Sequence, residues 1–122
     1  MIIGLTGLNG SGKGEISNIL KEQEFKYFSL SDIIREELIQ KRIDINRQNM
    51  IEMGNKLRKK FTPEVLAKRI LNKLEKGNSY IIDSIRNLGE ITILKTLPDF
   101  YLVGIIAPLK TRFERIKKRK RD

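Results

Sequence analysis

Residues 4–15 read GLTGLNGSGKGE, and this stretch decides the fold. It carries the spacing G-x-x-x-x-G-K from Gly7 to Lys13, directly after the apolar run Ile2 to Thr6 and directly before apolar residues at helical spacing. Glycines allow backbone N–H groups to curl around an anion, and the start of a helix adds a favourable field. The stretch therefore predicts a strand, a phosphate-binding loop and a helix in succession.

The loop supplies the residues that we expect to hold a nucleotide, with Lys13 reaching its β and γ phosphates. These residues are Gly7, Asn9, Gly10, Ser11, Gly12, Lys13, Gly14 and Glu15. The usual motif continues from lysine into a serine or threonine that touches magnesium, whereas Gly14 and Glu15 follow here. The Glu15 carboxylate would repel a nearby phosphate, but in the first turn of a helix it also suits the dipole and can point outward.

The composition is that of one globular domain. The 122 residues are 39% hydrophobic and 33% charged, which is enough for a single core. Cysteine and histidine are both absent, so disulfides, zinc sites built on these residues and histidine acid–base catalysis are excluded. The first residues lack the basic region of a signal peptide, and the longest apolar stretch, 101–109, is too short to span a bilayer. We therefore expect a cytoplasmic protein without a membrane partner.

The net charge of +10 is concentrated near the end of the chain. Residues 110–122 hold eight basic and two acidic residues. Such a run can bind nucleic acid or an anionic membrane, but it can equally form a solvated helix face. We expect no nucleic-acid partner, although binding through this run stays an alternative.

Strand and helix patterns alternate along the chain. Strands are predicted at 2–6, 25–30, 80–83 and 100–107. Helices are predicted from the loop to about residue 24, over 33–42, 46–60, 65–77 and 87–97, and after Pro108, with Ser31 or Asp32 as the N-cap of the second helix. This alternation predicts one α/β domain over residues 1–122, a three-layer parallel sheet of about four strands with helices on both faces, of the P-loop NTPase type.

With Gly14 after the lysine, the loop resembles that of adenylate kinase and related nucleoside monophosphate kinases, and later segments resemble the same family in the same order. FSLSDIIRE (28–36) resembles the Asp-x-x-Arg segment, which implies substrate-binding roles for Asp32 and Arg35. IIDSIRN (81–87) resembles the strand-end sequence Asp-Gly-x-Pro-Arg, without the proline and with the arginine one residue closer. The resemblance implies that Asp83 organises magnesium through water and that Arg86 clamps phosphate.

The last part of the chain, VGIIAPLKTRFERIKKRKR (103–121), resembles the strand, helix and arginine cluster that lead into the lid of these kinases. By that resemblance Arg115 and Arg119 join Lys13, Asp83 and Arg86 as catalytic residues that neutralise charge on the transferring phosphoryl group. The lid and last strand are expected to be absent. The segments look closest to a branch related to the kinase-like half of deoxycytidylate deaminases; no deaminase is present, because its zinc ligands need histidine and cysteine.

The expected function is that of an ATP-binding phosphotransferase of the nucleoside monophosphate kinase type, with ATP and Mg²⁺ as cofactors and a small nucleotide-like acceptor. Dephospho-coenzyme A kinases and small-nucleoside kinases remain alternatives within the same chemistry. A non-catalytic ATP- or dATP-sensing module is an alternative from another class, and nucleic-acid binding through residues 110–122 is a further one. The sequence determines neither the acceptor nor the oligomeric state.

Overall fold

A parallel sheet forms the centre of the molecule, for which we use a computed structural model that describes residues 1–6 and 13–104. The strands are β1 (Ile2–Thr6), β2 (Lys26–Ser29), β3 (Tyr80–Asp83) and β4 (Phe100–Gly104), in the order β2-β3-β1-β4. All three strand pairs are parallel, and Gly4 of β1 lies opposite Ile82 on one side and Leu102 on the other. The predicted parallel sheet of four strands is thereby confirmed.

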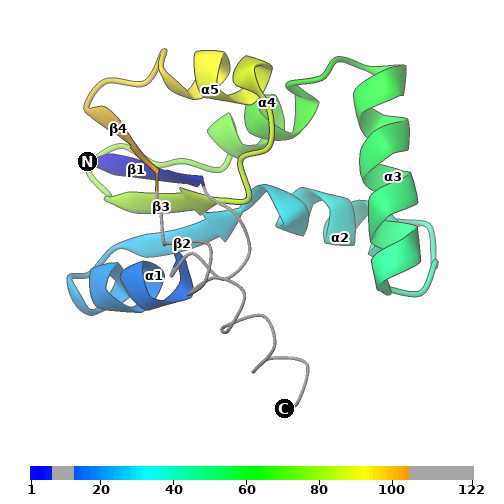
Figure 1. Cartoon of the computed structure of the whole chain (residues 1–122), viewed down its shortest axis with the longest axis horizontal. Coiled ribbons are helices and arrows are strands. Elements are labelled where there is room, and N and C mark those ends of the chain that lie inside the picture. The colour runs from blue at the N-terminus through cyan, green and yellow to red at the C-terminus, as the bar shows by residue number, and fades with distance from the viewer. Residues whose placement is uncertain (7–12, 105–122) are drawn as a thin grey trace, which may run out of the picture.

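Helices cover both faces of this sheet (Figure 1). The helices are α1 (Lys13–Glu22), α2 (Leu30–Gln40), α3 (Arg47–Lys60), α4 (Val65–Leu71) and α5 (Leu88–Leu94). Helix α1 lies against one face and α4 and α5 lie against the other, while α3 stands apart from the sheet and packs on α2 and α4. The three-layer α/β arrangement expected from the sequence is therefore correct. Within the described ranges no helix is long and apolar enough to cross a bilayer.

The main core lies between the sheet and helices α2, α4 and α5. Strand β3 is inaccessible on both faces, and its residues Tyr80, Ile81 and Ile82 are almost fully buried. A continuous apolar run is what a central parallel strand requires, because helices cover it from above and below. Leu66 and Ile70 of α4 complete the contact from one side.

The predicted start of α2 and the predicted ends of α4 and α5 were wrong, and α5 ends at Leu94 rather than at residue 97. At α2 and α4 a side chain binds the backbone at another place. Helix α2 begins at Leu30 with Ser29 as its N-cap, since the Asp32 carboxylate accepts a hydrogen bond from the Ser29 N–H in a capping box. Helix α4 ends at Leu71 rather than near residue 77. The Tyr80 hydroxyl accepts a 2.8 Å hydrogen bond from the Glu75 N–H and thereby holds the following segment against β3.

Gly4 is a site where an added methyl group should destabilise the fold. A Cβ at this position would lie 2.8 Å from both Ile85 Cδ1 and Phe100 Cζ. We therefore expect Gly4→Ala to lower the free energy of unfolding by about 1–3 kcal/mol, the usual cost of overpacking a core. Urea denaturation measures this loss. Gly104→Ala is the matched control on β4, because a Cβ there meets nothing within 4 Å; equal losses for both variants would contradict the packing argument.

Candidate functional site

The carboxyl ends of β1 and β3 define one edge of the sheet, and helix α1 starts beyond it. Strand β1 ends at Thr6 and α1 begins at Lys13, so the glycine-rich segment connects a strand to a helix as predicted. Glu15 lies in the first turn of α1 and is exposed. Its carboxylate is therefore placed where it suits the helix dipole.

Part of the predicted site falls outside the described residues. The loop residues Gly7, Asn9, Gly10, Ser11 and Gly12 belong to this part, as do Arg115 and Arg119. Their roles stay predictions, as does the role of the Lys13 side chain.

Asp83, at the end of β3, is held by a side chain from β2 and by the N–H of the residue that follows it. The Tyr27 hydroxyl on β2 donates a 2.8 Å hydrogen bond to Asp83 Oδ2, and the Ser84 N–H donates one of 2.7 Å to Oδ1. Burial, followed by the hydrogen bond to Asp83 and its negative charge, raises the pKa of Tyr27 to about 12. Tyr27 thus remains a neutral donor at physiological pH. The sequence reasoning had missed it, because its partner lies 56 residues away.

The turn after β3 has a strained backbone and is held by a hydrogen bond between two side chains. Ser84 has a φ angle of 65°, in the left-handed region that favours glycine, and glycine occupies this place in the kinase segment that residues 81–87 resemble. The Ser84 hydroxyl lies 2.7 Å from the Ser29 hydroxyl, which belongs to the neighbouring strand. This contact between β2 and β3 holds the peptide that follows Asp83.

The Asp83 carboxylate at this edge fits a magnesium ion carried by a nucleotide. No group of three or more acidic side chains that could hold a metal occurs within residues 1–6 and 13–104. Magnesium commonly retains several waters and binds one or two carboxylates together with substrate phosphates, rather than an all-protein cage. A single oriented carboxylate at Asp83 suits that mode of binding.

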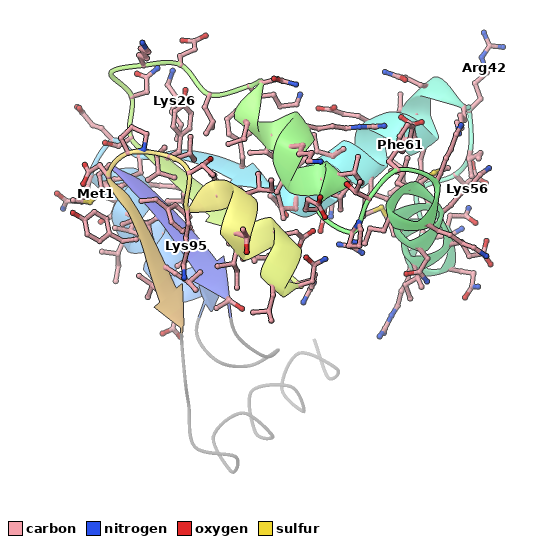
Figure 2. All side chains as sticks on the ribbon, turned by 90° about the horizontal axis from the view of Figure 1, so that it is seen from above. Met1, Lys26, Arg42, Lys56, Phe61 and Lys95 are labelled. Carbon is pink, nitrogen blue, oxygen red and sulfur yellow. The ribbon has the colours of Figure 1, made fainter. Side chains whose placement is uncertain are left out.

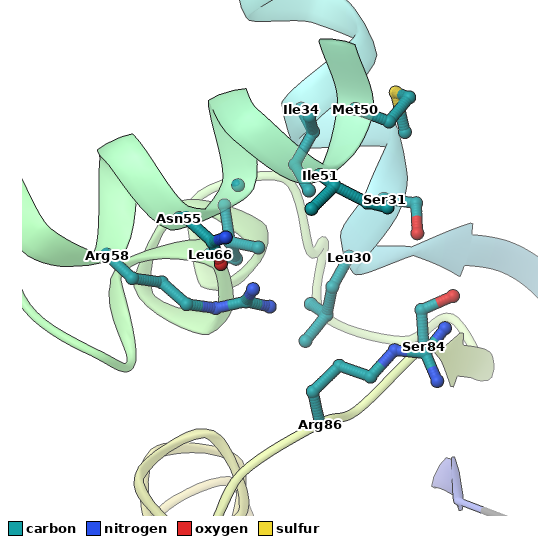
Figure 3. Close-up of a pocket in the computed structure, with 11 residues that line it drawn as sticks. Leu30, Ser31, Ile34, Met50, Ile51, Asn55, Arg58, Leu66, Ser84 and Arg86 are labelled. Carbon is teal, nitrogen blue, oxygen red and sulfur yellow. The ribbon is translucent and has the colours of Figure 1, made fainter. Parts of the chain in front are cut away.

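A cleft of about 370 Å³ lies between α2, α3, α4 and the segment after β3 (Figure 3). Its apolar wall consists of Leu30, Ile34, Met50, Ile51 and Leu66. Its polar side chains are Ser31, Asn55, Arg58, Ser84 and Arg86. Since Ser84 directly follows Asp83, the cleft adjoins the edge where a nucleotide phosphate is expected. A few polar groups on a largely apolar wall are typical of a small-molecule site.

Of the predicted substrate-binding residues, the structure brings Arg86 to this cleft but not Asp32 or Arg35. Asp32 caps α2, and its Oδ1 lies 2.8 Å from Arg35 Nη1 in an ion pair on the surface. The substrate-binding roles of Asp32 and Arg35 remain predictions from the resemblance.

Two charged residues that sequence reasoning missed form an ion pair at the cleft: Arg58 lines it, and Glu90 lies behind Arg58 and does not. Glu90 is completely buried, and its Oε1 accepts hydrogen bonds from the Arg86 N–H (2.7 Å) and the Asn87 N–H (3.2 Å). Its Oε2 lies 3.3 Å from Arg58 Nη2. The spacing Asn87-x-x-Glu90 ahead of an apolar run is a capping-box signal that would have located Glu90. Its pairing with α3 is visible only in the fold.

A larger cavity of about 470 Å³ lies at the opposite end of the sheet, near Met1 and Leu74. None of the predicted site residues lines it. The chemistry-bearing side chains therefore favour the smaller cleft.

Sequence comparison places the chain among known proteins. A family model described as an AAA domain matches residues 3–122. A UPF0200 protein of Thermococcus gammatolerans is 33% identical over 99% of this chain and 67% of its own length. The chain belongs to the UPF0200 family and matches the AAA-domain model. A UPF0200 protein of Aeropyrum pernix is 31% identical over the whole of this chain and 66% of its own length. The chain thus spans about two thirds of the length of the UPF0200 relatives that it matches.

Solved structures share the fold of this UPF0200 chain. A Chloroflexus aurantiacus protein superposes with a TM-score of 0.65 at 19% identity, covering 98% of this chain and 66% of its own. A gluconokinase from Sinorhizobium meliloti superposes with a TM-score of 0.57 at 13% identity, covering 98% of this chain and 65% of its own. The UPF0200 chain therefore has the P-loop kinase-like fold expected from the resemblance to nucleoside monophosphate kinases.

Proposed function

We propose that this chain is an ATP-binding phosphotransferase of the nucleoside monophosphate kinase type, which transfers the γ-phosphoryl group to a small nucleotide-like acceptor in the cleft. The observation that carries the proposal is the cleft beside Asp83, with an apolar wall for a base and arginine side chains for a phosphate. The family and a structural neighbour that is a gluconokinase support the same class of reaction.

In this proposal the chain mainly positions reactants and neutralises charge, because phosphoryl transfer needs little covalent chemistry from the protein. The glycine-rich loop and Lys13 hold the β and γ phosphates of ATP, and Arg86 holds the acceptor. Asp83, held by Tyr27 and Ser84, orients the water shell of the metal. Magnesium on the phosphates would supply charge neutralisation. Arg115 and Arg119 would approach the transferring group from the following segment.

The proposal predicts turnover of ATP that depends on both magnesium and an acceptor. We expect ADP formation when the 122-residue chain is mixed with MgATP and one of a panel of nucleoside monophosphates, measured by chromatography of the nucleotides. EDTA should abolish the reaction. Thermal shift with each nucleotide reports binding separately, because a ligand that binds only the folded state raises its stability. ATP binding without transfer to any acceptor would instead identify a nucleotide-binding module.

A further inference from the structure

Two arginine side chains reach into the cleft from different elements, Arg58 from α3 and Arg86 from the segment after β3 (Figure 3). We propose that Arg58 is a second guanidinium that binds the phosphate monoester of the acceptor, and that Glu90 is the positioning residue that holds Arg58 beside Arg86. This inference rests on the proposed acceptor cleft. It adds a second side chain that binds the phosphate of that acceptor, and the residue that positions this side chain.

The first argument is the rigid connection through Glu90. The Glu90 carboxylate receives two backbone N–H groups at one oxygen and the Arg58 guanidinium at the other. One of those N–H groups belongs to Arg86 itself. Glu90 therefore ties the Arg58 guanidinium to the backbone of Arg86, which fixes Arg58 beside the segment that carries the other arginine. A binding site needs this kind of support from residues behind it.

The second argument is the unused hydrogen-bonding capacity of the arginines. Arg58 is 24% exposed, and it donates to Glu90 through Nη2, whereas its Nη1 has no hydrogen-bond acceptor in the part of the chain that the structure describes. Its Nε also lacks an acceptor but is buried, so the free donor that the cleft can use is Nη1. A phosphate in the cleft brings several acceptor oxygens to a planar guanidinium, which is the geometry that arginine recognises best.

The third argument is charge. Glu90 balances one of the two guanidinium charges, and no ion pair to the Arg86 side chain occurs within residues 1–6 and 13–104. The cleft side chains thus leave one positive charge without a counter-ion close to an apolar wall. A phosphate monoester carries nearly two negative charges at neutral pH. An uncharged acceptor such as a nucleoside would leave the Arg86 charge without a counter-ion and the Arg58 donors without acceptors.

The fourth argument is the contrast with Arg35, the arginine that the resemblance implies for acceptor binding. Arg35 donates to Asp32 on the surface and does not line the cleft, whereas Arg58 does. In this chain α3 therefore supplies a guanidinium to the cleft, and this arginine lies outside the segment that resembles Asp-x-x-Arg.

The test compares a phosphorylated ligand with its dephosphorylated counterpart on defined variants of the 122-residue chain. The probes are AMP, CMP, UMP, GMP and dCMP, each beside its nucleoside, and isothermal titration gives the affinities. We expect Arg58→Gln to weaken monophosphate binding by about 10- to 100-fold while nucleoside and ATP affinities stay unchanged. Arg58→Lys should keep part of the affinity, since lysine retains the positive charge but lacks the planar set of N–H donors of a guanidinium.

Three further variants separate binding from folding and test the role of Glu90. Arg58→Met combined with Glu90→Gln removes both charges of the buried pair. Because no unpaired carboxylate is then left in the interior, we expect this double variant to fold. It should lose monophosphate affinity as Arg58→Gln does. Lys56→Ala is the matched control, because Lys56 is exposed on the same helix and does not line the cleft (Figure 2). If the Glu90→Gln single variant transfers phosphate, we expect a higher KM for the monophosphate with kcat and the KM for ATP unchanged.

The outcomes distinguish the two proposals. Unchanged monophosphate affinity in the folded double variant, or a wild-type chain that binds nucleosides as well as monophosphates, overturns the inference. A wild-type chain that phosphorylates only gluconate or another acceptor without phosphate also overturns it, while phosphotransfer stands. Monophosphate binding that depends on Arg58 without any transfer from ATP supports the inference and refutes the proposed reaction.

Discussion

Lys13→Ala should weaken ATP binding by at least about 100-fold and abolish phosphotransfer. An ammonium group that bridges the β and γ phosphates makes charge-assisted hydrogen bonds worth about 1.5–3 kcal/mol each, and two such bonds account for the expected loss. Lys13 is the first residue of α1, directly after the glycine-rich segment, and this is the position from which the proposal has its charge reach the phosphates. Titration with MgATP measures the affinity, and initial rates of ADP formation measure the reaction.

Lys26→Ala is the control for the loss of one positive charge. Lys26 is exposed at the amino end of β2, near the end of the sheet opposite the predicted loop (Figure 2). Its removal should leave ATP affinity within about twofold, since exposed charges beyond a Debye length are largely screened. Equal ATP affinities for Lys13→Ala and the wild-type chain, with unfolding curves that coincide, would show that the loop does not hold phosphates through this lysine.

Glu90→Ala should lower the free energy of unfolding by about 3–5 kcal/mol, a large share of the stability of a domain of this size. The change removes the acceptor of two buried N–H groups at the start of α5, takes the partner from Arg58 and leaves a cavity where a completely buried side chain stood. Urea denaturation followed by circular dichroism measures the loss. The far-ultraviolet signal also reports whether the variant is folded before urea is added.

Two other glutamate variants identify the cause of that loss. Glu90→Gln provides an amide oxygen that can accept the capping-box hydrogen bonds and removes only the charge, so it should be less destabilising than Glu90→Ala. Glu36→Ala breaks an exposed ion pair in which Glu36 Oε1 lies 2.7 Å from Lys73 Nζ. That loss should stay below about 1 kcal/mol. If Glu36→Ala proved as destabilising as Glu90→Ala, burial of the Glu90 carboxylate would not be what makes it important.

Much of the fold was predictable because its signals are local. A strand that is covered on both faces must be apolar throughout, and the runs that became β1 and β3 have this composition. The helix predicted over 46–60 was located to within one residue for the same reason, since the Asn46 side chain caps α3 by accepting from an N–H three residues away. The end of α4 was misplaced, because the contact that determines it comes from Tyr80 in a later strand.

The sequence by itself determined the parallel α/β fold, the strand–loop–helix context of Lys13 and the placement of Asp83 at the end of a strand, because each depends on residues close together in the chain. Only the tertiary structure brought Tyr27 to Asp83 and Arg58 to Glu90, across 56 and 32 residues. It also placed Arg58 and Arg86, rather than Arg35, on one cleft. Such pairs are created by the order of strands in the sheet and by the packing of α3 beyond it, and no spacing along the chain encodes them.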